Sequence, residues 1–201
     1  MTKCVLVSGC LSHYRDQILA YTKEIFSDTD SKVNVLWCMF ATSKAQEETK
    51  YQNYRTLYDP YFNQNREVEH TLASEECFVE EVHWADVIII HGGGNKRLRK
   101  MLQAVDLSKT FRDKIIVAHS SAANYLAAAA WSPGGRKVIE GRGVVPVKLI
   151  THYRSSTNED ERAPTDWDVV VKAVGEFGDT SLPVWTLRDG TFKTWPEKSP
   201  T

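Results

Sequence analysis

The sequence predicts an α/β protein in which helices cover both faces of a parallel β-sheet. Short runs of consecutive apolar residues alternate with longer stretches in which apolar residues recur at helical spacing. Two of the apolar runs pass directly into turns of glycine or other small residues, as a parallel strand does before a helix. The chain has 201 residues, which fits a single domain spanning 1–201 with a substantial core.

The N-terminal half supplies four strand–helix alternations. Strands are expected at 4–7, 33–37, 68–72 and 86–90, all short and rich in β-branched or other apolar residues. Helices are expected at 17–26, from Ser43 to the Asp59-Pro60 pair, at 75–83 and at 96–105. Proline lacks the N–H that a helix interior needs, so Pro60 is expected to end the second helix.

The C-terminal half is less regular. A strand at 114–117 is expected to lead through the small-residue turn 118–123 into a helix that continues through Ala130. A strand at 144–150, an exposed loop at 155–165 and a helix at 167–177 follow. The Asp-Gly step in Arg188-Asp189-Gly190 predicts a hairpin between strands 184–187 and 191–194.

Composition excludes several classes of protein. The chain has 25 basic and 26 acidic residues and a net charge of −1, which gives no electrostatic case for nucleic acid or a membrane surface as partner. No apolar run approaches the ~20 residues of a membrane helix, and no signal peptide is visible. Four widely spaced cysteines in apolar surroundings indicate buried thiols and a cytoplasmic protein. The dispersed histidines predict no metal site.

The first turn that could bind a ligand or take part in catalysis is His91-Gly92-Gly93-Gly94-Asn95, after the buried strand 86–90. Three glycines let the backbone approach a ligand closely and direct N–H groups at a phosphate or an oxyanion. The turn is not a P-loop and lacks the spacing of a dinucleotide-binding motif.

The second turn is 118–124, Ala-His-Ser-Ser-Ala-Ala-Asn. A strand, a sharp turn and a helix, with small residues two places before and after a serine, form a nucleophile elbow. Ser120 has Ala118 and Ala122 at these positions, whereas Ser121 would need the bulky His119 at one of them. Ser120 is therefore the predicted nucleophile.

A serine nucleophile needs a base, and the chain has six histidines. His152 follows the strand 144–150, so it is expected at the carboxyl edge of the sheet with both turns, where α/β proteins bind ligands. His119 is adjacent to Ser120, but neighbouring side chains at an elbow diverge. We expect His119 and His91 to line the pocket instead.

Together these segments resemble the peptidase E family, aspartyl dipeptidases related to cyanophycinase. That family carries a GGGN-type turn, a G-x-S-A-G-A-N elbow and a histidine in a strand-end segment reading roughly N-P-H-F. The matching segments here are Gly92–Asn95, 118–124 and 150–153, in the same order, with alanines replacing both elbow glycines. The resemblance runs from Val5 to the Asp189-Gly190 region.

The resemblance implies a flavodoxin-like, three-layer sandwich with a mostly parallel central sheet, as in class I glutamine amidotransferases. It implies cleavage of short peptides after an N-terminal aspartate, without a cofactor, by attack of Ser120 with His152 as base. Gly93 and the Ser121 N–H would hold the oxyanion. The substrate contacts it implies involve Gly92, Gly94, Asn95, His119, Arg162 and, alternatively, Arg154.

The family's triad acid lies between the nucleophile and the histidine, where this chain has only Glu140. Either Glu140 substitutes or the third member is missing, and loss of that acid from a triad costs ~10⁴ in kcat. A catalytically impaired member that binds a small anionic ligand or a partner in the same pocket is therefore the alternative. A cysteine-based amidotransferase is disfavoured because the elbow holds serine. A monomer or a homodimer is expected.

Overall fold

The computed structural model describes residues 2–9, 15–64, 66–155 and 164–196. Its main sheet has six strands in the order β10-β1-β5-β4-β2-β3. All neighbouring strands are parallel except β10, which pairs antiparallel with β1. The strands are β1 (Lys3–Val7), β2 (Lys32–Cys38), β3 (Glu67–Leu72), β4 (Val87–Ile90), β5 (Ile115–His119) and β10 (Phe192–Trp195).

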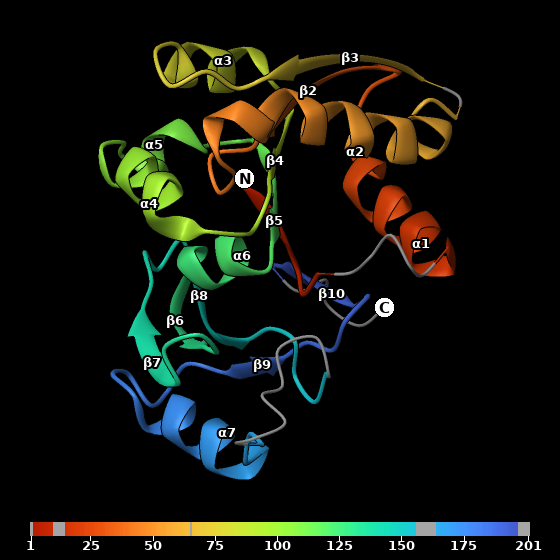
Figure 1. Cartoon of the computed structure of the whole chain (residues 1–201). Helices are drawn as coiled ribbons and strands as arrows, with labels where there is room; N and C mark the ends of the chain where they lie inside the picture. The colour runs from red at the N-terminus through yellow and green to blue at the C-terminus, as the bar shows by residue number, and fades with distance from the viewer. Residues whose placement is uncertain (1, 10–14, 65, 156–163, 197–201) are drawn as a thin grey trace.

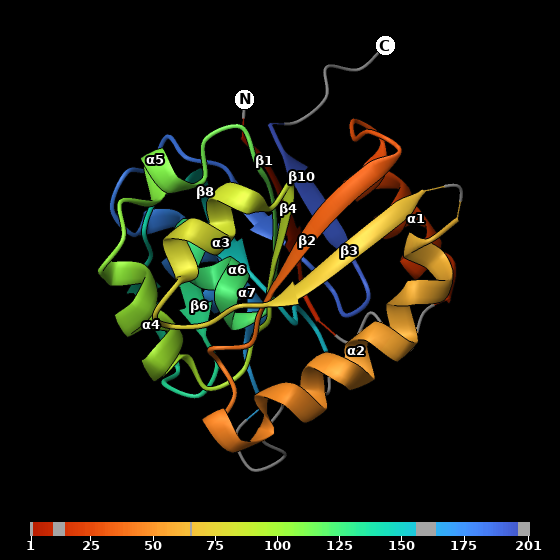
Figure 2. The same cartoon turned by 90° about the horizontal axis from the view of Figure 1, so that it is seen from above.

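Helices cover both faces of this sheet, as Figure 2 shows from above. One face carries α1 (Arg15–Phe26) and α2 (Glu47–Phe62), the latter preceded by the short 3-10 turn η2 (Lys44–Gln46). The other carries α3 (Phe78–Trp84), α4 (Asn95–Gln103), α5 (Leu107–Thr110) and α6 (Ser121–Leu126). The predicted three-layer α/β fold with a mostly parallel central sheet is confirmed.

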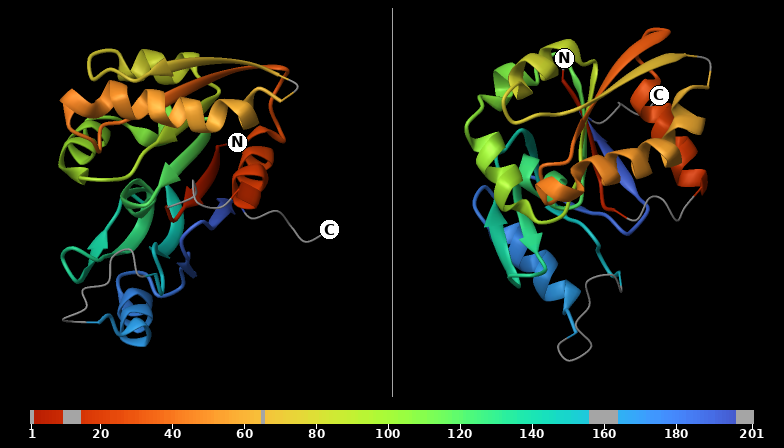
Figure 3. Two further views of the ribbon diagram at one scale, coloured as in Figure 1. Left: turned by 45° about the vertical axis from the view of Figure 1, so that its right-hand side comes forward. Right: turned by 45° about the horizontal axis from the view of Figure 1, so that its top comes forward.

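A second, four-stranded sheet continues the structure beyond α6. Its order is β7-β6-β8-β9, with β6, β8 and β9 parallel and β7 antiparallel to β6. The strands are β6 (Ala127–Ser132), β7 (Lys137–Glu140), β8 (Val145–Ile150) and β9 (Val184–Thr186). Helix α7 (Trp167–Glu176) packs on its outer face, at the bottom of Figure 1 and in both views of Figure 3.

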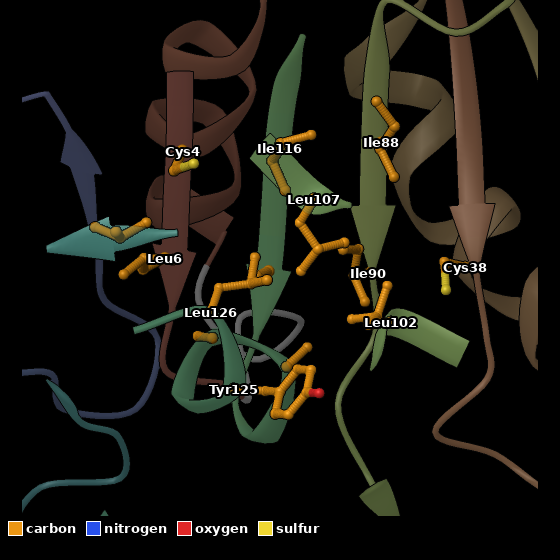
Figure 4. Packing of buried hydrophobic residues seen from close by; sticks show 14 of the residues in the cluster. Cys4, Leu6, Cys38, Ile88, Ile90, Leu102, Leu107, Ile116, Tyr125 and Leu126 are labelled. Atoms are coloured by element: carbon orange, nitrogen blue, oxygen red, sulfur yellow. The ribbon is translucent and has the colours of Figure 1, made fainter. Parts of the chain in front are cut away.

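The core follows the two-residue period of the strands. In β4, Ile88 and Ile90 pack toward α4 and α5, whereas Val87 and Ile89 pack toward α1 and α2. Figure 4 shows the apolar cluster on the α4 and α5 side, where Leu102, Leu107 and Leu126 reach the sheet from three helices. Each such aliphatic side chain, once fully buried, contributes ~1.5–3 kcal/mol. Because helices cover both faces of the sheet, all four residues of β4 are buried and the strand is an unbroken apolar run.

Two predicted helix ends and one predicted hairpin are wrong. Helix α2 runs past Pro60 to Phe62, which is fully buried against the sheet. The expected helix through Ala130 ends at Leu126, because 127–132 pairs with β7 and β8 as strand β6, and this pairing overrides the helical preference of alanine. The expected hairpin does not form, since β9 pairs with β8 and β10 pairs with β1.

The cysteines agree only in part with the expectation of buried thiols. Cys4 and Cys38 are buried, and burial raises the pKa of each thiol to about 12. Cys77 is exposed, so its prediction is wrong, and Cys10 lies outside the described residues. None of the described helices is both long and apolar enough to cross a membrane.

Candidate active site

The carboxyl ends of strands from both sheets meet at one place. Strands β1, β4 and β5 of the main sheet end there in the segments Ser8-Gly9, 91–94 and Ser120. Strands β8 and β9 of the second sheet end in His152 and in the turn that holds Asp189. The segment between β9 and β10 therefore joins the two sheets at the place where these turns lie close together.

Ser120 has the backbone of a nucleophile elbow. It follows β5 directly and has φ 50° and ψ −115°, a conformation that non-glycine residues rarely adopt. Its N–H donates to the carbonyl of Val7 at 2.7 Å, and its own carbonyl accepts from the N–H of Asn124 at 3.0 Å. These bonds fix the sharp turn from strand to helix, as the small-residue pattern predicted.

The glycine turn packs against this elbow. A Cβ atom on Gly92 would lie 2.4 Å from the carbonyl oxygen of His119 and 2.9 Å from Cβ of Ser120. Gly93 has φ +142°, and a Cβ there would meet the carbonyl oxygen of Ala41 at 2.8 Å. Only glycine fits at these two positions, so the turn is built for close approach of backbones.

The end of β1 holds His152 in place. The His152 N–H donates to Oγ of Ser8 at 2.7 Å, and this hydroxyl donates to the carbonyl of Leu187 at 3.1 Å. A Cβ on Gly9 would lie 2.7 Å from Cε1 of His152, so the imidazole lies directly on the glycine backbone. His152 itself has φ 55° and is 7% exposed. Its position is thus set by the end of β1, which is itself held by the residue after β9.

A chain of hydrogen bonds runs through this histidine. Oγ of Ser120 lies 2.8 Å from Nε2 of His152, and Nδ1 of His152 lies 2.5 Å from Oδ1 of Asp189. The hydroxyl of Ser155 donates to the other carboxylate oxygen, Oδ2. The side chains of His152 and Asp189 are 9% and 11% exposed. A hydroxyl, an imidazole and a carboxylate in this order are the parts of a serine-nucleophile triad.

The expectation for Glu140 as the third member is corrected by this geometry. Asp189 and Ser120 take both ring nitrogens of His152, leaving none for Glu140. Glu140 ends strand β7 with an exposed side chain, opposite Ala129 of β6. The acid lies after the histidine in the chain because the β9–β10 crossing, and not the segment between elbow and histidine, reaches Nδ1.

The two expected oxyanion donors differ in their present bonding. The N–H of Gly93 donates to Oγ of Ser121 at 2.9 Å, and the same hydroxyl donates back to the carbonyl of Gly93 at 3.0 Å. Ser121 is the first residue of α6, where backbone N–H groups have no acceptor within the helix. Among the described residues this N–H makes no backbone hydrogen bond, so it can donate to an incoming oxygen.

A cavity of about 300 Å³ opens in front of Ser120 and His152. The glycine turn, the elbow, helix α6 and the β6–β7 turn form its walls. Its described lining residues are Gly93, Gly94, Ser120, Ser121, Asn124, Tyr125, Ser132, Pro133, Gly134, Ile139, Thr151 and His152. Within it, Thr151 donates to the side-chain oxygen of Asn124 at 3.3 Å. A short peptide segment fits a cavity of this size.

His119 and His91 do not line this cavity, contrary to expectation. Both side chains lie on the α1/α2 side of the sheet, where their rings stack with centroids 4.8 Å apart. Nε2 of His119 lies 3.0 Å from Oη of Tyr21. Burial lowers the pKa of His119 to about 4, and burial with the neighbouring His119 lowers the pKa of His91 well below its ordinary value. Both are neutral packing residues behind the two turns.

The expected arginines are not brought to the cavity within the described residues. Arg154 is half-exposed and lies over the ring of Tyr153, with Nη2 3.5 Å from Oδ1 of Asp168. Arg162 lies outside the described residues. Gly94 lines the cavity, and Asn95 begins helix α4.

Four residues of the site escaped sequence reasoning: Asp189, Ser8, Gly9 and Ser155. Asp189 carries a signal, because an acidic residue shortly after an apolar strand belongs at the carboxyl edge, but the Asp-Gly step favours a hairpin. Ser8-Gly9 carried the same signal after β1. Ser155 lies in a polar loop with no pattern to distinguish it.

Comparison with solved structures identifies the fold. A peptidase from an acI-B1 actinobacterium superposes with a TM-score of 0.60 at 16% identity, covering 96% of this chain and 83% of that one. A Listeria monocytogenes EGD-e protein solved as a candidate peptidase E gives 0.62 at 13% identity, covering 98% and 96%. No family model matches the sequence, and no curated protein matches it closely. The chain therefore has the fold of peptidase E-like proteins.

Proposed function

We propose that the protein is a serine peptidase that hydrolyses short peptides, with Ser120, His152 and Asp189 as its catalytic residues. The observation that carries this proposal is the continuous hydrogen-bond chain from the hydroxyl of Ser120 through His152 to Asp189. It lies at the mouth of a cavity, in a fold shared with two solved proteins named as peptidases. The strained elbow at Ser120 adds support, because such strain is typical of functional sites.

The proposed reaction is an acyl transfer in two steps. Oγ of Ser120 attacks the scissile carbonyl carbon while Nε2 of His152 takes the hydroxyl proton. The tetrahedral intermediate collapses, the C–N bond breaks, and the amine leaves with that proton. A water molecule, activated by the same nitrogen, then hydrolyses the acyl-enzyme. Asp189 holds Nδ1 protonated throughout, so that Nε2 faces the serine as an acceptor.

The oxyanion of the intermediate forms between the elbow and the glycine turn. The N–H of Ser121 is the first donor and the N–H of Gly93 is the second. Removing one such donor in a serine peptidase costs ~3 kcal/mol of transition-state stabilisation. The requirement for glycine at positions 92 and 93 supports this role, since it brings the turn's backbone against the elbow.

The substrate class we propose is short peptides with an acidic N-terminal residue. The resemblance to aspartyl dipeptidases supports it, and arginine is the side chain that would recognise the carboxylate, through its planar, bidentate fork. Arg162 is our first choice for this role, because the described partners of Arg154 are Asp168 and Tyr153. The main reason to consider a catalytically impaired protein that only binds an anion is a missing triad acid. Asp189 supports the active alternative, because it supplies a carboxylate to His152.

A panel of dipeptides tests both parts of the proposal. Aspartyl and alanyl dipeptides with the same second residue are incubated with the wild type, Ser120→Ala and Arg162→Ala, and product is followed by mass spectrometry. We expect Ser120→Ala to lose turnover of every substrate while keeping its melting temperature. Arg162→Ala should lose only the preference for aspartate. Unchanged turnover by Ser120→Ala would refute the nucleophile, and equal wild-type rates on both dipeptides would refute the acidic preference.

A further inference from the structure

Ser121 bridges the two turns that meet at the proposed oxyanion hole. Its hydroxyl accepts from the N–H of Gly93 at 2.9 Å and donates to the carbonyl of the same residue at 3.0 Å. Both partners line the cavity in front of Ser120, so the bridge faces the space that a substrate enters. Both hydrogen bonds are made to a single residue and neither is needed to complete a helix or a strand.

This bridge occupies the donor that the reaction needs. An oxyanion-hole donor acts on an oxygen 2.7–3.1 Å away. Oγ of Ser121 lies 2.9 Å from the N–H of Gly93, so the hydroxyl oxygen stands where that donor would hold the oxygen of a tetrahedral intermediate. A single N–H directed at one acceptor is unavailable to another along the same line. The second donor is therefore blocked while this hydrogen bond is made.

We infer that the Ser121 hydroxyl is a displaceable gate on the oxyanion hole, an inference that rests on the proposed peptidase function. The side chain is only half-buried and borders the cavity, so it can turn about χ1 to another staggered position. Turning breaks both hydrogen bonds to Gly93 and frees its N–H for the substrate oxygen. The gate thus lowers the rate of the chemical step without touching Ser120, His152 or Asp189.

The test compares Ser121→Ala, which lacks the gate but keeps the backbone N–H, with Ser121→Thr, which keeps a hydroxyl. Ser181→Ala is the matched control, because this exposed serine lies before β9, at the end of that strand opposite Asp189. Steady-state hydrolysis of a dipeptide substrate gives kcat and KM for each. Amide hydrogen exchange of Gly93, measured by NMR, reports the hydrogen bond itself without reference to activity.

We expect Ser121→Ala to raise kcat about fivefold with little change in KM, the effect of removing a competing hydrogen bond worth ~1 kcal/mol. Gly93 should exchange faster in this variant and at the wild-type rate in Ser121→Thr, while Ser181→Ala keeps kcat and the Gly93 exchange rate within twofold of wild type. A folded Ser121→Ala variant whose kcat is equal to or below that of the wild type would refute the gate. The hydroxyl would then only stabilise the contact between the two turns. If the wild type and every variant failed to hydrolyse the substrate or react with a fluorophosphonate, the peptidase proposal would fail, and the gate with it.

Discussion

The carboxylate on the far nitrogen of His152 decides which tautomer the imidazole adopts, and through it the reactivity of Ser120. Asp189→Asn keeps the shape but presents an amide, which favours the wrong tautomer. We expect kcat/KM to fall by ~10⁴ with KM nearly unchanged, because the acid orients the base and does not bind substrate. Glu140→Gln is the matched control, since Glu140 is exposed at the end of β7. Equal losses in both variants would contradict the assignment of Asp189.

Ser155 supports the same carboxylate from its other side. Its hydroxyl donates to Oδ2 of Asp189, so Ser155→Ala leaves that oxygen with one partner fewer. A hydrogen bond to a charged group contributes ~1.5–3 kcal/mol when its partner is buried, and part of this is recovered from water. We expect kcat to fall about tenfold, Ser155→Thr to restore most of it, and the pH profile of kcat/KM to shift in Ser155→Ala alone. An unshifted profile would show that Ser155 does not act on the triad.

The glycine turn is an element whose shape depends on the absence of side chains. Gly92→Ala places a Cβ atom 2.4 Å from the carbonyl of His119, whereas Gly94→Ala meets only Ala41 at 3.6 Å. Gly94 has φ −65°, which alanine adopts without strain. We expect Gly92→Ala to lower the free energy of unfolding by ~3 kcal/mol in urea titrations and Gly94→Ala to change it by under ~1 kcal/mol. Similar values for the two would contradict the close packing of turn and elbow.

The elements that sequence predicts well are those whose pattern is local. Strand β4 is recognisable because a strand buried on both faces is an unbroken apolar run, here of four residues. The turns after β4 and β5 are recognisable because their small residues stand together in the sequence. The run 127–132 is not recognisable, because alanine is compatible with either structure and the strand is set by pairing with β7 and β8 rather than by its own residues. The role of Asp189 could not be predicted for the same reason. The Asp-Gly turn closes no hairpin only because β9 pairs with β8 and β10 pairs with β1.

Across the whole molecule, buried histidines make stability depend on pH. Burial lowers the pKa of His119 and of His70 each to about 4, from an ordinary value of 6.5. The folded state therefore binds fewer protons than the unfolded state between these values, so stability is fully present above pH 6.5 and is lost as pH falls toward 4. For His119 the loss is ~3 kcal/mol at most.

Melting curves at pH 7.5 and pH 5 check this dependence. We expect the wild type to melt lower at pH 5 and His119→Gln to show a smaller drop between the two conditions, whatever its absolute stability. His83→Gln is the control, because His83 is exposed on α3 and its loss should leave the drop unchanged. An identical pH dependence in wild type and His119→Gln would contradict a buried, neutral His119.

The arrangement of the molecule explains why the candidate site could be predicted in outline and not in full. Ser120 and His152 follow strands of different sheets, and the rule that ligands gather at carboxyl strand ends was enough to bring them together. The sequence contained no trace of the second sheet as a separate unit. Without it, neither the crossing from β9 to β10 nor the place of Asp189 beside His152 could be anticipated.

We propose that Ser120 is a nucleophile activated by His152 and Asp189. A fluorophosphonate probe followed by peptide mapping tests it most directly, because the reagent phosphonylates only an activated serine. We expect one adduct per chain, on Ser120, that is absent from Ser120→Ala and slowed in His152→Gln and Asp189→Asn. No adduct on the folded wild type, or an adduct that persists in Ser120→Ala, would contradict it.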